Sequence, residues 1–342
     1  MGLLNFFKKK NKKQKDLGLV VEISTDFDDN YKVRKTAEYK RYEELQTVAI
    51  FLNWAKKGYP ILPIKNYPAY MTYKLNINNP IKFHNEMITK GYLEKPNIYS
   101  LFFYFKVSEL KEILTENNLP KTGNKDILIE RILNNVPNEY ISKIHSNYKG
   151  YVPSSKGDKF IKDNIDFIEM HKNSNWMISL DEYINKKNQL KFDASFYDIA
   201  WGVFNDRNIQ YYCEKNWGLV RNNILNMSEI LNNENKQEQA LSFLLSVLYY
   251  SLSGLGNNNI LYEFKHIDCP PGIIERILKL KKFYSDDLIN NCPFISQLPF
   301  SYFTPDTFKS IINDLLNTNE INLDDYKNYI QKPDKKLLNN IN

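Results

Sequence analysis

Residues 105–136 read FKVSELKEILTENNLPKTGNKDILIERILNNV, and this segment has the most specific pattern of the 342-residue chain. Apolar residues recur at steps of three and four on both sides of Leu119-Pro120, which predicts two amphipathic helices joined by a turn. Gly123 gives the link a conformationally free position, and Thr122 or Asn124 can cap the second helix. The two apolar faces, which must pack on each other, comprise Val107, Leu110, Ile113 and Leu114, and Leu128, Ile129, Ile132 and Leu133.

The same segment resembles the SAP domain, a helix–extended loop–helix module found in DNA-associated proteins. The resemblance implies binding to duplex DNA, often AT-rich, through the loop and the N-terminus of the second helix. The flanking segments are similar to those of SAP-containing proteins from low-GC bacteria and their mobile elements, a likeness that implies no activity. The residues that carry the SAP match are Val107-x-x-Leu110-Lys111, Leu114, Leu119-Pro120, Gly123-x-Lys125 and Leu128-Ile129-x-Arg131-Ile132.

A physical reason for phosphate binding is visible in the loop. Backbone N–H groups at residues 123–125 would point outward from a helix N-terminus, its partial positive end, while Lys121 and Lys125 add charge. Arg131 can lie on phosphate or along the helix pair. The residues predicted to contact nucleic acid are Lys106, Lys111, Lys121, Thr122, Gly123, Asn124, Lys125 and Arg131.

The charge of the chain limits how strongly it can bind nucleic acid. Six of the 46 basic residues lie in residues 1–15, which contain no acid, so the other 40 basic residues balance the 40 acidic residues. This distribution excludes a uniformly basic protein that coats nucleic acid. Residues 105–136 are neutral overall, which predicts modest affinity because phosphate neutralisation dominates sequence-independent binding. A SAP-like module that binds protein rather than DNA is therefore the alternative.

The sequence also indicates a compartment. Three widely spaced cysteines, Cys213, Cys269 and Cys292, suit a reducing environment without a disulfide framework. The apolar N-terminal residues precede the lysines, the reverse of a secretory signal. The longest apolar run, Ala240–Leu252, contains serines and is shorter than the ~20 residues of a membrane span. We expect a cytoplasmic protein without a membrane span.

Hydrophobic periodicity predicts a mainly α-helical fold with one short β ribbon. The ribbon is expected to pair Tyr92-Leu93 with the aromatic run Tyr99–Phe105, and two helices flanking a polar break at Glu234–Gln239 are expected to form an αα-hairpin. The predicted organisation is a basic leader (1–37), an N-terminal domain that contains the SAP-like module (38–190), a C-terminal helical domain (191–330) and a tail (331–342).

No residue pattern predicts an enzyme, a metal site or a cofactor. The four histidines lack neighbours that would complete a metal site or a catalytic triad. Glu263-Phe264-Lys265 has the Glu-x-Lys form of metal-dependent nucleases, but the nearest upstream aspartate, Asp206, is far away in the sequence. We therefore expect a non-enzymatic DNA-binding protein with no catalytic residues, whose C-terminal domain binds a protein partner. The alternative is an interaction scaffold that uses this helical domain as its main surface.

Overall fold

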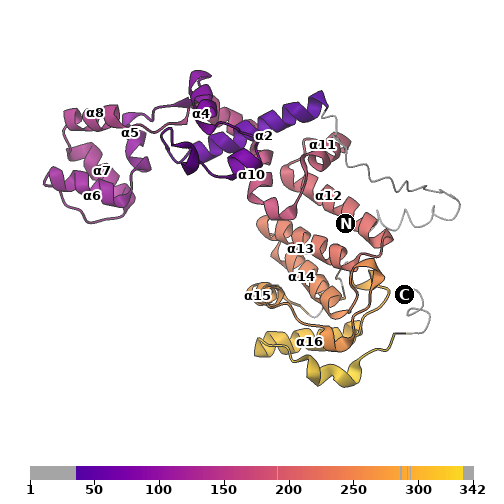
Figure 1. Cartoon of the computed structure of the whole chain (residues 1–342). Coiled ribbons are helices and arrows are strands. Elements are labelled where there is room, and N and C mark those ends of the chain that lie inside the picture. The colour runs from indigo at the N-terminus through magenta and orange to yellow at the C-terminus, as the bar shows by residue number, and fades with distance from the viewer. Residues whose placement is uncertain (1–35, 191, 286, 291, 293, 334–342) are drawn as a thin grey trace. The chain divides into compact units, whose positions relative to one another are not determined.

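The computed structural model describes residues 36–190, 192–285, 287–290, 292 and 294–333, and it is mainly helical (Figure 1). Helices account for 67% of the residues and strands for 2%, so the predicted fold class is confirmed. Residues 1–35 of the predicted leader, with all its lysines up to Lys15, lie outside the described residues, as do residues 334–342 of the predicted tail. None of the helices within the described ranges is long and apolar enough to cross a membrane.

Helices α4 and α9 begin where the sequence supplies a capping residue. Asn79 precedes Pro80, and its side-chain oxygen accepts a hydrogen bond from the backbone N–H of Lys82 at 3.0 Å. Ser154 caps α9 in the same way through Gly157. The elements outside residues 95–151 and before residue 215 are α2 (Ala37–Ala55), η1 (Ile64–Asn66), α3 (Tyr70–Tyr73), α4 (Pro80–Thr89), α9 (Ser155–Asp163), α10 (Ile165–Lys172), η3 (Ser174–Trp176), α11 (Leu180–Gln189) and α12 (Phe196–Cys213).

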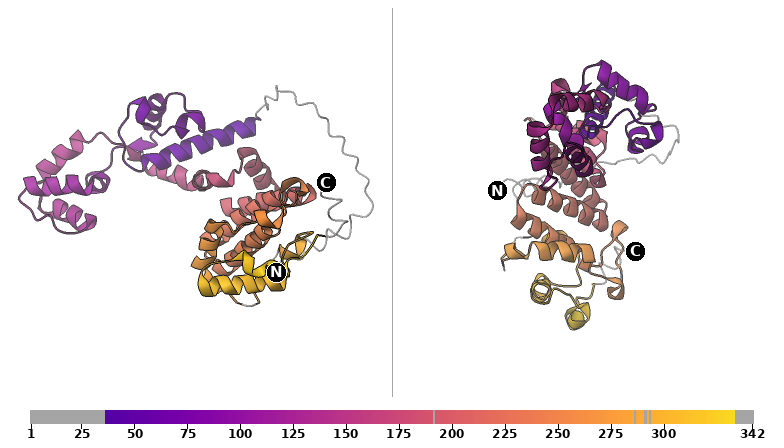
Figure 2. Two further views of the ribbon diagram at one scale, coloured as in Figure 1. Left: turned by 60° about the horizontal axis from the view of Figure 1, so that its bottom comes forward. Right: turned by 90° about the vertical axis from the view of Figure 1, so that its left-hand side faces the viewer.

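The predicted αα-hairpin is confirmed by α13 (Trp217–Asn233) and α14 (Gln237–Leu252), which pack side by side (Figure 2). Helix α14 is buried on nearly every side, as its apolar sequence predicts. Thr304 caps the later helix α16 through the backbone N–H of Thr307. The remaining C-terminal elements are η4 (Asn257–Asn259), η5 (Phe264–His266), α15 (Pro271–Lys279), η6 (Lys281–Phe283), η7 (Ile295–Gln297), α16 (Pro305–Thr318) and η8 (Leu323–Tyr329).

The β ribbon is present, but one of its predicted strands is wrong. Strand β1 (Leu93–Glu94) pairs antiparallel with β2 (Val152–Pro153), a segment that follows the SAP-like module. The aromatic run Tyr99–Phe105 instead forms α5 (Ile98–Leu101) and η2 (Phe102–Tyr104). The physical reason is a cap, because the Asn97 side chain accepts the backbone N–H of Ser100 at 2.8 Å and starts a helical turn.

The ribbon brackets a segment that has its own hydrophobic core. A main cluster of buried side chains runs from α2 to α16, whereas a second cluster lies wholly within residues 101–141. A module with a separate core keeps its shape from its own packing. The predicted domain boundary at residue 190 stays a prediction. The buried residues of the second cluster are Leu101, Phe102, Leu110, Ile113, Leu114, Leu128, Ile129, Ile132, Val136 and Ile141.

Candidate nucleic-acid interface

Two helices that pack face to face form the framework of the candidate site. Helix α6 (Val107–Glu116) and helix α7 (Lys125–Asn135) lie on the two sides of Leu119-Pro120, as the sequence predicts, and α8 (Asn138–Asn147) follows them. Helix α6 ends at Glu116 and is followed by Asn118, a left-handed residue, after which the backbone N–H of Leu119 bonds back to the Leu114 carbonyl at 2.8 Å. The loop between the helices therefore leaves α6 in a fixed direction.

The loop enters α7 through a glycine and an asparagine. Gly123 has a φ of +125°, a conformation that other residues rarely adopt. Of the two predicted caps, Asn124 is the one observed, since its Oδ1 accepts the backbone N–H of Ile127 at 3.0 Å. The side chain of Thr122 does not cap the helix, and its backbone carbonyl accepts a hydrogen bond from Arg131 instead.

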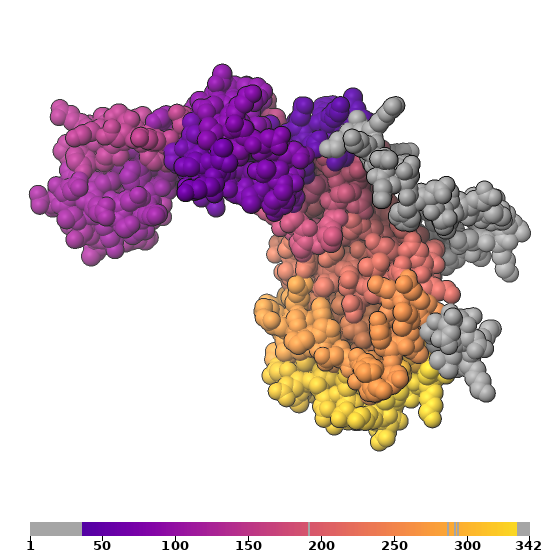
Figure 3. All heavy atoms as spheres, viewed as in Figure 1, coloured from indigo at the N-terminus to yellow at the C-terminus, as the bar shows by residue number. Residues whose placement is uncertain are grey.

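The start of α7 presents hydrogen-bond donors to solvent. Within the described part of the chain, the backbone N–H groups of residues 123–126 have no acceptor, and residues 121–124 are all exposed. The partial positive charge of a helix N-terminus favours an anion at such a position. This arrangement can bind a phosphate oxygen through the backbone. The module that carries it is coloured magenta in the space-filling view (Figure 3).

Two of the predicted site cations hold the loop in place. The Lys125 ammonium donates to the carbonyl oxygen of Phe103 at 2.7 Å, which ties η2 to the start of α7. The Arg131 guanidinium donates to the carbonyl oxygens of Pro120 and Thr122, the latter at 2.9 Å. Arg131 therefore lies against the carbonyl groups of the loop, a position that the sequence did not predict.

The other predicted cations are exposed lysines. Lys106, Lys111 and Lys121 make no ion pair with any described residue. Lys106 precedes α6, where its backbone N–H donates to the Glu109 carboxylate. No contact within the described ranges brings Lys111 to the loop. An exposed acid, Asp126, lies in the first turn of α7 and opposes anion binding there.

Two aromatic residues beside the loop were not predicted as site residues from the sequence. Tyr99 on α5 and Phe103 on η2 are among the exposed large hydrophobic side chains. The strand predicted for Tyr99–Phe105 is an extended segment, so the helical turn that carries the two rings was not predicted. The Asn97 cap was the available signal.

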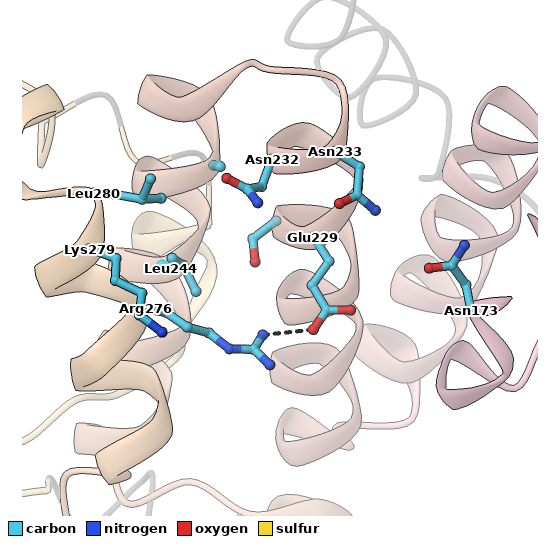
Figure 4. A pocket seen from close by; sticks show the side chains of 10 residues that line it. Asn173, Glu229, Asn232, Asn233, Leu244, Arg276, Lys279 and Leu280 are labelled. Atoms are coloured by element: carbon cyan, nitrogen blue, oxygen red, sulfur yellow. Dashed lines mark hydrogen bonds and ion pairs between the residues drawn. The ribbon is translucent and has the colours of Figure 1, made fainter. Parts of the chain in front are cut away.

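A pocket of about 390 Å³ lies outside the SAP-like module, between α13, α14, α15 and the end of α10 (Figure 4). Its central carboxylate, Glu229, accepts hydrogen bonds from Arg276 at 2.7 Å and from the Trp176 indole at 2.7 Å. The carboxylate is therefore neutralised by groups of its own chain. The pocket is lined by Asn173, Ser228, Glu229, Asn232, Asn233, Ala240, Leu244, Arg276, Lys279 and Leu280.

The residues considered for catalysis have local partners. Glu263 pairs with Lys265 at 2.7 Å, and Asp206 pairs with Lys186. His84 is fully buried, and its Nδ1 bonds to the Tyr67 hydroxyl at 2.9 Å, while burial lowers its pKa to about 4. No group of three or more metal-ligating side chains occurs in the described ranges.

Comparisons with known proteins bear on the SAP-like module alone. No curated protein and no solved structure matches the chain. The family model of the SAP domain matches residues 102–137, a range that contains α6, the loop and α7. This match indicates a nucleic-acid-binding module at residues 102–137.

Proposed function

We propose that this protein binds duplex DNA through the loop at residues 121–124 and the N-terminus of α7, and that it catalyses no reaction on the DNA. The observation that carries the proposal is the row of backbone N–H groups at residues 123–126, which lack acceptors within the described residues and follow the exposed Lys121. Gly123 has no side chain, so a phosphate can approach this backbone closely.

The number of available cations sets the strength of binding. Lys121 is exposed next to the backbone donors, whereas Lys125 already donates to a carbonyl oxygen. With so few free charges near the loop, we expect contact with a few phosphates only. The logarithm of affinity then falls with the logarithm of salt concentration by roughly 0.9 per phosphate contacted.

The test is a titration of the full chain into fluorescently labelled AT-rich and GC-rich duplexes over a series of salt concentrations. Lys121→Glu places a negative charge beside the backbone donors at an exposed position of the loop, so we expect it to abolish most of the binding while the fold is retained. Lys143→Glu, on the exposed surface of α8, is the matched control for charge and should bind almost as the parent does.

The lysines near the N-terminus need their own control. A full-length variant with Lys8, Lys9, Lys10, Lys12, Lys13 and Lys15 replaced by Gln separates their contribution from that of the module. If binding disappears with these lysines and survives Lys121→Glu, the module does not carry the activity. Tighter binding to the AT-rich duplex is the expected preference, because the SAP resemblance implies it.

A protein-binding role for the C-terminal helices is the second candidate. The pocket beside α13 and α15 favours it, because exposed amides and Lys279 surround an apolar floor at Ala240 and Leu244. Lys279→Glu should then weaken capture of a partner without changing DNA binding. If Lys279→Glu and Lys121→Glu both leave the respective interactions unchanged, neither surface has the assigned role.

The proposed setting is the cytoplasm. The support is that Cys213, Cys269 and Cys292 are all free thiols, as a reducing compartment would keep them. The likeness of the flanking segments to proteins of low-GC bacteria and their mobile elements stays a prediction from the sequence.

A further inference from the structure

Two aromatic side chains at the N-terminal edge of the SAP-like module, one of them just before it, are exposed to an unusual extent. Tyr99 is 75% exposed and Phe103 is 55% exposed. Within the described ranges, neither ring contacts another aromatic ring. The adjacent residues Leu101 and Phe102 are fully buried and supply this turn's contribution to the module's core. The two exposed rings are therefore not needed to hold the module together.

The two rings belong to one helical segment. Residues 98–104 are helical throughout, first in α5 and then in η2, and Tyr99 and Phe103 are four residues apart. Side chains at this spacing are neighbours on a helix surface. Together the rings form an exposed aromatic face, which we call the Tyr99–Phe103 face.

This face is fixed beside the start of α7. The backbone carbonyl of Phe103 accepts the Lys125 ammonium at 2.7 Å, and Lys125 is the first residue of α7. Lys106, exposed, follows Phe103 by three residues. Ile127 in the first turn of α7 is also exposed. Exposed apolar side chains and lysines thus occur together along residues 99–106 and in the first turn of α7.

We propose that the Tyr99–Phe103 face stacks on unpaired bases of the DNA strand whose phosphates lie at residues 121–124. The preferred ligand is then DNA with unpaired bases, such as a bubble or a junction between single and double strand, rather than an uninterrupted duplex. This inference rests on the proposed function, and it adds the state of the bases to the phosphate contact.

The chemistry of the face favours a nucleic acid over a protein partner. Aromatic rings interleaved with cations are the combination that binds unpaired strands, because every base offers a π-face and every linkage a phosphate. In an intact duplex the base faces are covered by neighbouring bases, so exposed aromatic rings cannot stack on them. Unpaired bases leave these faces open to stacking.

The experiment compares two labelled DNAs of the same sequence with the full chain: an intact duplex, and a duplex with about four unpaired bases at its centre, including 2-aminopurine as a stacking reporter. We expect the wild type to bind the bubble about tenfold more tightly than the duplex and to quench the 2-aminopurine fluorescence. The double variant Tyr99→Leu/Phe103→Leu should lose the quenching and the preference, with duplex affinity unchanged within about twofold.

The control is Tyr73→Leu, because Tyr73 on α3 is 74% exposed and lies outside the module. Far-UV circular dichroism checks folding, and if the double variant is unfolded, Tyr99→Leu alone carries the test. Equal wild-type affinity for bubble and duplex, both lost in Lys121→Glu, would overturn this inference and leave the proposed function intact. Absence of binding to either DNA would overturn both.

Discussion

Replacing Gly123 by alanine tests whether the loop conformation holds the candidate interface. Gly123 has a φ of +125°, and a Cβ built there would lie 2.7 Å from the Cγ2 and 3.0 Å from the Cβ of Ile127. The Cβ of Ile127 is fixed to the backbone and cannot move away as the end of a flexible side chain could, and the Cγ2 moves only if Ile127 changes its rotamer. The loop or the first turn of α7 must therefore shift.

The expected cost has three parts. An L-residue in this backbone region costs about 1–3 kcal/mol. Turning Ile127 off its preferred rotamer costs about 0.5–1.5 kcal/mol more. The smaller conformational entropy of alanine in the unfolded chain returns about 0.4–1 kcal/mol. The net destabilisation of the module is about 2 kcal/mol, which corresponds to a roughly 30-fold increase in the opening equilibrium.

Hydrogen exchange of the α6 and α7 amides measures this change locally, which matters because the module has a core separate from the main cluster. We expect faster exchange there and weaker DNA binding in Gly123→Ala. Adding Ile127→Ala to Gly123→Ala should recover only the part of the destabilisation that comes from the changed Ile127 rotamer. Gly272→Ala in α15 is the control, since nothing lies within 4 Å of the position that the added methyl group would take, and this change should be neutral or stabilising. Unchanged α7 exchange in Gly123→Ala would refute the reasoning.

Three further substitutions change a single polar side chain each. Arg131→Met removes the donor to the Pro120 and Thr122 carbonyls and should destabilise the loop by about 1 kcal/mol. The cost is smaller than for a buried pair, because water can replace the donor. Hydrogen exchange of the α7 amides measures this destabilisation. Asp126→Asn removes an exposed acid from the first turn of α7 and should raise DNA affinity about threefold, as measured by fluorescence anisotropy. The same change should weaken the helix by about 0.3–1 kcal/mol, as measured by hydrogen exchange. Burial lowers the pKa of His84 from 6.5 to about 4, so as the pH falls the imidazole is protonated in the unfolded chain before it is protonated in the folded chain. Stability should therefore fall by roughly 3 kcal/mol as the pH drops from about 6.5 to about 4, and His84→Asn should remove this part of the pH dependence in urea unfolding.

Local sequence signals predicted the elements whose causes are local. The boundaries of α6 and α7 follow from apolar periodicity and from Asn124, whose side chain caps the helix that it precedes. The hairpin of α13 and α14 follows from two apolar stretches and a polar break. In each case the residues that determine the element lie within it or next to it, so the sequence contains the whole argument.

The errors arose where the cause is distant in the sequence or where two patterns compete. The partner of β1 is β2, which lies beyond the entire module, and no local pattern of Leu93 identifies it. An aromatic run such as Tyr99–Phe105 favours a strand by composition. The segment is nevertheless helical, because the Asn97 side chain satisfies a backbone donor in the first turn. The sequence also could not show that Lys125 reaches Phe103, 22 residues away.

That long-range bond changes how the lysines of the module are to be counted. A cation that donates to a carbonyl oxygen of its own chain must break or share this bond to neutralise a phosphate. Lys125 and Arg131 are both in this position, so their charges organise the loop more than they attract DNA. The salt dependence of binding should then be shallow, with a slope of roughly −1 to −3 on logarithmic axes, corresponding to about one to three phosphates. In the variant whose N-terminal lysines are replaced by Gln, a steeper slope would mean that the two side chains leave their carbonyls on binding, and Phe103 would then no longer be tied to α7.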